Sequence, residues 1–290
     1  MARGQLVRRP LRRLSDRARP LVREATRARR GPARFRGAGH PRYVFVVTYG
    51  RSGSTLVQGL LNALPGALIR GESNFYLLEL FRAQERAISF RRQHIRHGVR
   101  NVRSAFYGLG EVRRSHFVRF TRRLMVKQLL GTAKPSSVTM LGFKEVLWHR
   151  IAPDETEPFF EFFERVFPDA RYVLNRRDHG QVLGSGFWQS EEAETVMDAI
   201  RRGEEVQDYL RRTSPERVYD TEYESLTSDD PSVVDRQLRG LAEFAAGACD
   251  DQLLDAMRGT MATGHGPYPF GRSRGRAAQR ARQPGSNASR

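Results

Sequence analysis

The stretch YVFVVTYGRSGSTLVQGLL, residues 43–61, joins an apolar run to a glycine turn and then to a segment with helical spacing. The consecutive apolar residues 44–47 predict a buried strand, and the apolar spacing after the turn predicts a helix. Between them stands Gly-Arg-Ser-Gly-Ser-Thr at 50–55. A glycine turn that leads into a helix N-terminus favours an anion, because backbone N–H groups and the helix dipole both point at it. The sequence therefore predicts an anion site directly after this strand.

Side chains in the turn strengthen this prediction. Ser52, Ser54 and Thr55 add hydroxyl donors, and Arg51 adds a planar cation. The alternative is an ordinary strand–helix turn in which glycine serves the backbone geometry and serine caps the helix. A P-loop NTPase would carry G-x-x-x-x-G-K-[ST], but Ser54 stands where that motif has its lysine. No apolar strand runs directly into an aspartate that would hold Mg²⁺, so the turn predicts anion binding without an evident metal site.

Strand and helix patterns alternate along the rest of the chain. β-forming runs lie around 138–143, in ARYVLNRRD (170–178) and in ERVYDTEYESL (216–226), with helical patterns between them. This alternation predicts an α/β fold with a parallel sheet flanked by helices. Ligands of such sheets bind at the carboxyl ends of the strands, and the charged motifs of this chain follow its predicted strands.

The net charge of +18 in 290 residues is concentrated at the two ends of the chain. Arginine far exceeds acidic residues in 1–42 and in 272–290, whereas the residues between are close to neutral overall. We expect 1–42 to be a basic, disordered leader, 43–275 to form the α/β domain and 276–290 to be a basic, disordered tail. Such basic arms fit weak contact with an anionic membrane. No zinc-finger, homeodomain-like or RNP1-like signature is present, so we expect no specific nucleic-acid partner.

Targeting and redox signals are few. The single cysteine, Cys249, excludes an internal disulfide and a cysteine-based metal site. There is no run of 18 apolar residues that would span a membrane, and no apolar segment typical of a secretory signal. We expect a cytoplasmic protein, peripheral at most at the inner membrane face. The oligomeric state is not readable from the sequence.

A family resemblance appears in TYGRSGSTL, residues 48–56. It resembles the 5′-phosphosulfate loop of the sulfotransferases, commonly T-Y-P-K-S-G-T-T-W. Arg51 matches the lysine of that loop, and Ser52, Gly53, Ser54 and Thr55 match the next four residues. The resemblance implies that Arg51 stabilises the bridging oxygen as the phosphate leaves.

A second motif is YVLNRRDHGQVLGSGFW, residues 172–188. It resembles the family's 3′-phosphate segment, a strand and an arginine followed eight positions later by a serine, and Arg177 and Ser185 have that separation. An arginine at a strand end and a serine in the next helical turn can converge on one phosphate. The alternative is an unrelated salt bridge and a helix cap.

Two shorter segments extend the resemblance. YESL (223–226) resembles the segment whose tyrosine packs near the adenine, which makes Tyr223 a candidate; a buried structural tyrosine is the alternative. FGRSRG (270–275) resembles the late loop that closes on the 3′-phosphate, so Arg272 and Arg274 are candidates, with altered spacing in a tail rich in arginine. The resemblance spans roughly 43–275 and leaves 85–130 without a match.

The sulfotransferase family transfers a sulfuryl group from 3′-phosphoadenosine 5′-phosphosulfate (PAPS) to a hydroxyl or amine. The resemblance implies a three-layer, P-loop-like α/β fold with PAPS as co-substrate and no metal requirement. It also implies that residues 76–130 form a helical lid over a small-molecule, glycan or lipid acceptor. The arginine-rich segment 91–123 is a weak hint of an anionic acceptor. A P-loop nucleotide kinase or NTPase, and a non-catalytic polyanion-binding protein, remain the alternatives.

An acceptor hydroxyl must lose its proton to a general base. Cytosolic sulfotransferases place a histidine two residues after a strand lysine, but Lys144 is followed here by Glu145 and Val146. The bacterial and carbohydrate-type branches instead use a carboxylate after the second strand, where this chain has Glu72. The resemblance therefore implies Glu72 as base and Lys144 as a side chain that points into the site. The remaining candidates for the base are Glu145, His149 and His179, and Glu72 would also suit a helix N-terminus by its charge alone.

Overall fold

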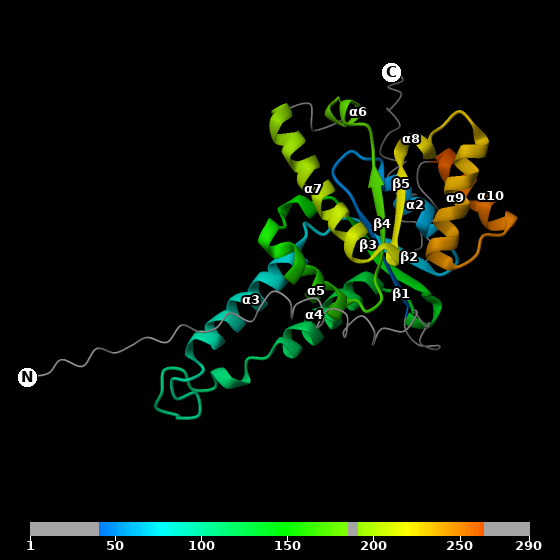
Figure 1. Cartoon of the computed structure of the whole chain (residues 1–290). Helices are drawn as coiled ribbons and strands as arrows, with labels where there is room; N and C mark the ends of the chain where they lie inside the picture. The colour runs from blue at the N-terminus through cyan, green and yellow to red at the C-terminus, as the bar shows by residue number, and fades with distance from the viewer. Residues whose placement is uncertain (1–40, 185–190, 264–290) are drawn as a thin grey trace, which may run out of the picture. The chain divides into compact units, whose positions relative to one another are not determined.

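The computed structural model describes residues 41–184 and 191–263, so the predictions for Ser185, Arg272 and Arg274 lie outside the described residues. A five-stranded parallel sheet forms the centre of the described domain, in the order β2-β3-β1-β4-β5 (Figure 1). Its strands are β1 (Arg42–Val47), β2 (Ala67–Arg70), β3 (Met140–Glu145), β4 (Arg171–Arg176) and β5 (Val218–Glu222). The predicted α/β class is thereby confirmed.

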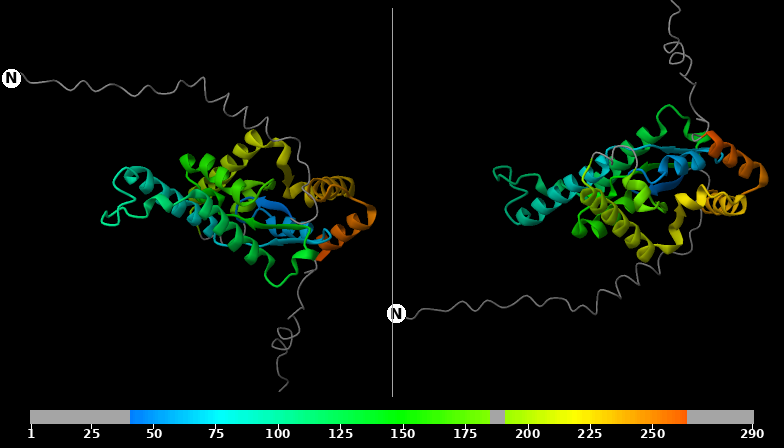
Figure 2. Two further views of the ribbon diagram at one scale, coloured as in Figure 1. Left: turned by 90° about the horizontal axis from the view of Figure 1, so that it is seen from below. Right: turned by 90° about the horizontal axis from the view of Figure 1, so that it is seen from above.

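Helices cover both faces of the sheet, which makes three layers (Figure 1, Figure 2). One face carries α3 (Tyr76–His94), α4 (Arg114–Leu130), α5 (Thr156–Val166) and α7 (Ala193–Thr213). The other face carries α2 (Ser54–Asn62), α9 (Pro231–Ala246) and α10 (Asp251–Thr263). The short helix α8 (Tyr223–Leu226) directly follows β5, and two residues separate the short helix α6 (His179–Leu183) from β4. 3₁₀ turns occupy Leu109–Glu111, Pro135–Ser137, Trp148–Arg150, Pro153–Glu155 and Pro215–Arg217.

The apolar run 44–47 forms most of β1, the central strand of the sheet. Side chains of β1 alternate between the two faces, so Phe45 packs in the core under α5 while Val44 and Val46 pack under α2 and α9. All three are fully buried, as expected for a parallel strand covered on both sides. On the α5 side the core is aromatic: the rings of Phe45 and Phe163 lie 4.7 Å apart at 77°, an edge-to-face contact that favours packing.

One predicted element is corrected by the structure. The strand expected around 138–143 is Met140–Glu145, so Lys144 and Glu145 are its last two residues. The edge strand β2 directly precedes the loop that carries Glu72. Residues 95–113 separate α3 from α4 and contain only the 3₁₀ turn Leu109–Glu111. None of the described helices has both the length and the apolar character needed to span a bilayer.

Candidate active site

Strand register brings the predicted site residues to one edge of the sheet. Val47, the last residue of β1, is aligned with Glu145 of β3 and with Leu174 of β4. Arg176 at the end of β4 is aligned with Glu222 at the end of β5. Because all strands are parallel, the segments that follow them emerge at the same edge, where α/β sheets bind their ligands.

The glycine turn is shaped by two residues with positive φ. Arg51 has a φ of 64°, and Gly53, directly before α2, has a φ of 81°. The ring of Tyr223 lies against Gly53 so closely that a Cβ there would be 2.1 Å from the ring Cδ2. Glycine is therefore required at 53 by the backbone conformation and also by the approach of Tyr223.

Arg177 connects the turn to Tyr223. Its Nη1 donates to the carbonyl of Arg51 over 3.2 Å, and its guanidinium carbon lies 4.2 Å from the centroid of the Tyr223 ring, a cation–π contact. Its Nη2 donates to Gln181 on α6 over 3.0 Å. Its Nε is buried with no hydrogen-bond partner among the described residues. Arg51, Gly53, Arg177 and Tyr223 thus form one group, here called the loop cluster.

Two residues that the sequence analysis missed hold this cluster in place. The Tyr49 hydroxyl donates to the carbonyl of Arg177 and accepts from its N–H, each over 3.0 Å. Burial raises the pKa of Tyr49 to about 12, so the hydroxyl keeps its proton at neutral pH. Asn175, fully buried in β4, donates from Nδ2 to the carbonyl of Ser52 over 2.7 Å. The sequence did contain a signal for each residue: Tyr49 stands beside the glycine turn, and Asn175 is a polar residue inside an apolar strand.

The predicted hydroxyls of the turn differ in their surroundings. Ser52 is fully buried, and its Oγ lies 2.6 Å from Thr48 Oγ1, which lies 2.8 Å from the carbonyl of Asn175. Since the Thr48 hydroxyl has one proton, it donates to that carbonyl and accepts from Ser52. Ser54 is buried and Thr55 is exposed. The Ser52 side chain is therefore engaged with Thr48, which in turn is hydrogen-bonded to the end of β4.

The predicted base and the predicted lysine are in contact. Lys144 Nζ forms an ion pair with Glu72 Oε1. The Lys144 side chain is 7% exposed whereas that of Glu72 is 46% exposed. The buried ammonium therefore holds one carboxylate oxygen of Glu72 while much of that side chain faces solvent.

Glu145 has a different environment from Glu72. Its side chain is fully buried, and Oε2 accepts from the N–H and Oγ of Ser73 over 3.1 and 3.2 Å and from the N–H of Phe75 over 3.1 Å. Oε1 accepts from the N–H groups of Val146 and Leu147 over 2.9 and 3.3 Å. The Glu145 carboxylate receives five hydrogen bonds and is shielded from solvent, so it fixes the loop after β2. An acceptor substrate cannot reach it.

The family of the chain follows from its similarity to known proteins. A profile described as the sulfotransferase family matches residues 41–244. The chain belongs to the sulfotransferase family. No curated protein matches the chain.

Solved structures similar to this sulfotransferase are distant in sequence. The sulfotransferase domain of the Synechococcus PCC 7002 olefin synthase has 18% identity and a TM-score of 0.41, with 79% of this chain and 80% of that chain covered. A sulfotransferase from Mycobacterium avium has 18% identity and a TM-score of 0.40, covering 81% and 70%. The sulfotransferase domain from the curacin biosynthetic pathway has 16% identity and a TM-score of 0.40, covering 76% and 78%.

The two histidine candidates of this sulfotransferase lie in separate surroundings. His179 Nε2 is 3.1 Å from Glu204 Oε1 on α7. His149 follows β3 in a 3₁₀ turn, and burial lowers the pKa of His149. Of the candidates for the base, Glu72 combines an exposed carboxylate with a place at the strand ends, and it stays the predicted base.

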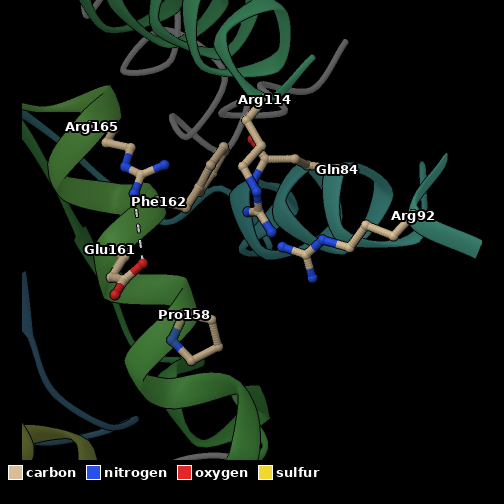
Figure 3. A pocket seen from close by; sticks show the side chains of 7 residues that line it. All are labelled: Gln84, Arg92, Arg114, Pro158, Glu161, Phe162 and Arg165. Atoms are coloured by element: carbon tan, nitrogen blue, oxygen red, sulfur yellow. Dashed lines mark ion pairs between the residues drawn. The ribbon is translucent and has the colours of Figure 1, made fainter. Parts of the chain in front are cut away.

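A pocket of about 250 Å³ lies between α3, α4 and α5 (Figure 3). Its lining contains none of the predicted site residues. Two of its cations are already paired, Arg114 with Glu85 and Arg165 with Glu161. We assign no ligand to this pocket. Its lining residues are Gln84, Arg92, Arg114, Pro158, Glu161, Phe162 and Arg165.

Proposed function

We propose that this sulfotransferase transfers a sulfuryl group from PAPS to a hydroxyl, or amine, of an acceptor such as a glycan or glycolipid. The observation that carries the proposal is the loop cluster. Arg177 contacts both the carbonyl of Arg51 and the ring of Tyr223, which in turn packs on Gly53. The three segments that the resemblance associates with one nucleotide are therefore in mutual contact.

The donor set of the cluster suits a doubly phosphorylated nucleotide. Backbone N–H groups at the start of α2 have no acceptor within their helix, and together with the Arg51 guanidinium they would bind the 5′-phosphosulfate. Arg177, whose buried Nε has no partner among the described residues, would bind the 3′-phosphate together with Ser185. Tyr223 offers its ring to the adenine. Arg272 and Arg274 remain proposed contacts to the 3′-phosphate.

Glu72 and Lys144 have the chemistry needed at the acceptor. In the proposed step the acceptor oxygen forms a bond to sulfur, the bond from sulfur to the bridging phosphate oxygen breaks, and the adenosine bisphosphate leaves with that electron pair. Glu72 takes the acceptor proton. Arg51 and Lys144 supply positive charge where negative charge develops, which is electrostatic stabilisation by groups already in place.

Calorimetric titration with adenosine 3′,5′-bisphosphate tests the donor assignment, with ATP and Mg²⁺ as comparison. We expect the bisphosphate to bind and ATP not to bind. Arg177→Ala should weaken binding roughly tenfold or more, because a charge-assisted phosphate contact is lost. Arg201→Ala, an exposed arginine on α7 paired with Asp198, is the matched control and should bind as the wild type does. Absence of bisphosphate binding would overturn the PAPS assignment, and Mg²⁺-dependent ATP binding would support a kinase.

A further inference from the structure

A helical arm extends from the sheet on the α3 side. It consists of residues 86–123, which are the outer half of α3, the connection 95–113 and the first turns of α4 (Figure 1, Figure 2). The inner parts of the same helices pack in the core through Leu77, Phe81 and Met125. The arm is therefore anchored to the domain at its base while its outer end faces solvent.

The helical arm is strongly basic. Residues 86–123 contain eleven arginines, and Glu111 is their single acidic residue. Because the chain between its two basic ends is close to neutral, this positive charge is concentrated on one projection. Most of it is not neutralised locally, because seven exposed arginines make no ion pair with any described carboxylate: Arg86, Arg92, Arg96, Arg100, Arg103, Arg119 and Arg123.

The helical arm also carries exposed large apolar side chains. Within the described residues, all four large apolar side chains that are exposed lie on it: Phe90 at 47%, Val102 at 71%, Tyr107 at 58% and Phe120 at 59%. Phe90 contacts Phe106 with ring centroids 6.2 Å apart, so aromatic rings of α3 and of the connection 95–113 lie together at the outer end. Exposed apolar side chains gathered in one place mark an interaction surface.

We infer that the helical arm docks on an anionic lipid bilayer. Arginines attract the negative surface of such a bilayer, and Phe90, Val102 and Tyr107 bury their apolar groups at the boundary of headgroups and acyl chains. Tyrosine suits this boundary because its ring is apolar and its hydroxyl is polar. A second copy of the arm would be repelled by like charge. A soluble polyanion would pair with the arginines but would leave an exposed aliphatic side chain such as Val102 without a partner.

Insertion of the helical arm is measured with Val102→Trp in the full-length chain. The protein is mixed with vesicles of phosphatidylcholine alone or of phosphatidylcholine with phosphatidylglycerol, each containing brominated acyl chains. We expect a blue shift and quenching of the added tryptophan with the anionic vesicles and neither with the neutral ones. The native tryptophans are present in both proteins, so the wild-type emission is subtracted. Co-sedimentation with anionic vesicles without quenching at position 102 would overturn the inference and assign binding to the basic leader or tail. The same spectral change with heparin but not with vesicles would assign the arm to soluble polyanions.

A second experiment removes positive charge from the arm and compares the effect with removal of the same charge elsewhere on the domain. The triple variant Arg96→Gln, Arg100→Gln, Arg103→Gln is compared with Arg201→Gln, Arg212→Gln, Arg236→Gln, which removes equal charge from exposed positions on α7 and α9. Both keep the basic ends of the chain. We expect partition onto anionic vesicles to fall by roughly tenfold or more in the arm variant and by much less in the control. Equal losses would show a general charge effect and contradict a docking surface. Circular dichroism checks that both variants are folded.

Discussion

The carboxylate of Glu145 accepts hydrogen bonds from the backbone N–H groups of both Ser73 and Phe75, each over 3.1 Å. Lys144, the residue before it in β3, instead contacts the carboxylate of Glu72. Successive strand residues point to opposite faces, so these two adjacent side chains hold the same loop in different ways. Glu145 binds the backbone of the loop, and Lys144 binds the side chain of Glu72, the predicted base. The loop needs this support because Asn74 and Phe75 have φ values of 55° and 53°, and a positive φ is unfavourable for a bulky residue such as Phe75.

We predict that Glu145→Gln destabilises the protein by about 3 kcal/mol, because a buried carboxylate with five donors becomes an amide whose NH₂ group faces N–H groups. Transfer activity should fall as well, since the loop that carries Glu72 loses its anchor. The measurement is urea unfolding followed by circular dichroism. Glu79→Gln, an exposed α3 residue paired with Arg82, is the control and should cost well under about 1 kcal/mol. Equal unfolding midpoints for the two variants would rule out the anchoring role.

We predict that Glu72→Gln lowers the transfer rate by about 10²–10⁴-fold, the usual contribution of a general base. Affinity for adenosine 3′,5′-bisphosphate should not change, because Glu72 contacts Lys144 and lies outside the loop cluster. Single-turnover transfer to an accepted substrate and calorimetry measure the two quantities separately. Glu79→Gln again serves as the control. A Glu72→Gln variant with near wild-type turnover would assign the base to another residue.

We predict that Gly53→Ala costs several kcal/mol and that part of this cost disappears when Tyr223 is truncated. A Cβ at 53 would be 2.1 Å from the Tyr223 ring, so the ring must move. In a Tyr223→Ala background that clash is gone, and the cost that remains is the positive φ, on the order of 1–2 kcal/mol. Unfolding free energies of the two single variants and the double variant form a cycle. Additive costs would mean that the ring does not press on Gly53.

The sequence was sufficient to predict the fold, because predicted strands and helices alternate along it and the central strand is an uninterrupted apolar run. Val44 to Val47 are buried on both sides, and such a strand belongs to few architectures other than a parallel sheet between two helical layers. The candidate site followed from the same pattern. Charged residues at the end of a strand, such as Lys144 in β3, or directly after one, such as Arg177 after β4, lie at one edge of the sheet.

The sequence could not show how the side chains support one another. Glu145 was an alternative base because it directly follows Lys144. Only the path of the loop after β2 shows that backbone N–H groups already donate to its carboxylate. Gln207 is on α7, about thirty residues from β4, yet its Nε2 donates to the carbonyls of Val47 and Asn175 over 2.9 and 3.2 Å. Such contacts depend on tertiary packing, which leaves no local signal in the chain.

We predict that His149 makes the protein less stable as the pH falls below neutrality. Burial lowers the pKa of His149, opposed in part by a hydrogen bond to the backbone of Val146, and its Nδ1 is buried without a partner among the described residues. The pKa of this group is therefore lower in the folded than in the unfolded chain. The unfolded state binds more protons as the pH drops, so His149 contributes stability above its unfolded pKa of about 6.5 and loses it as the pH falls through the folded value.

Unfolding free energies between pH 7.5 and 5.5 test this prediction. In His149→Gln that pH dependence should be shallower than in the wild type, because the glutamine cannot take up a proton. His116→Gln, an exposed position on α4, is the matched control and should keep the wild-type slope. The interval ends above the range where carboxylates with ordinary or lowered pKa values titrate, so their protonation does not contribute. Identical slopes for all three proteins would show that His149 is free to take up a proton in the folded chain.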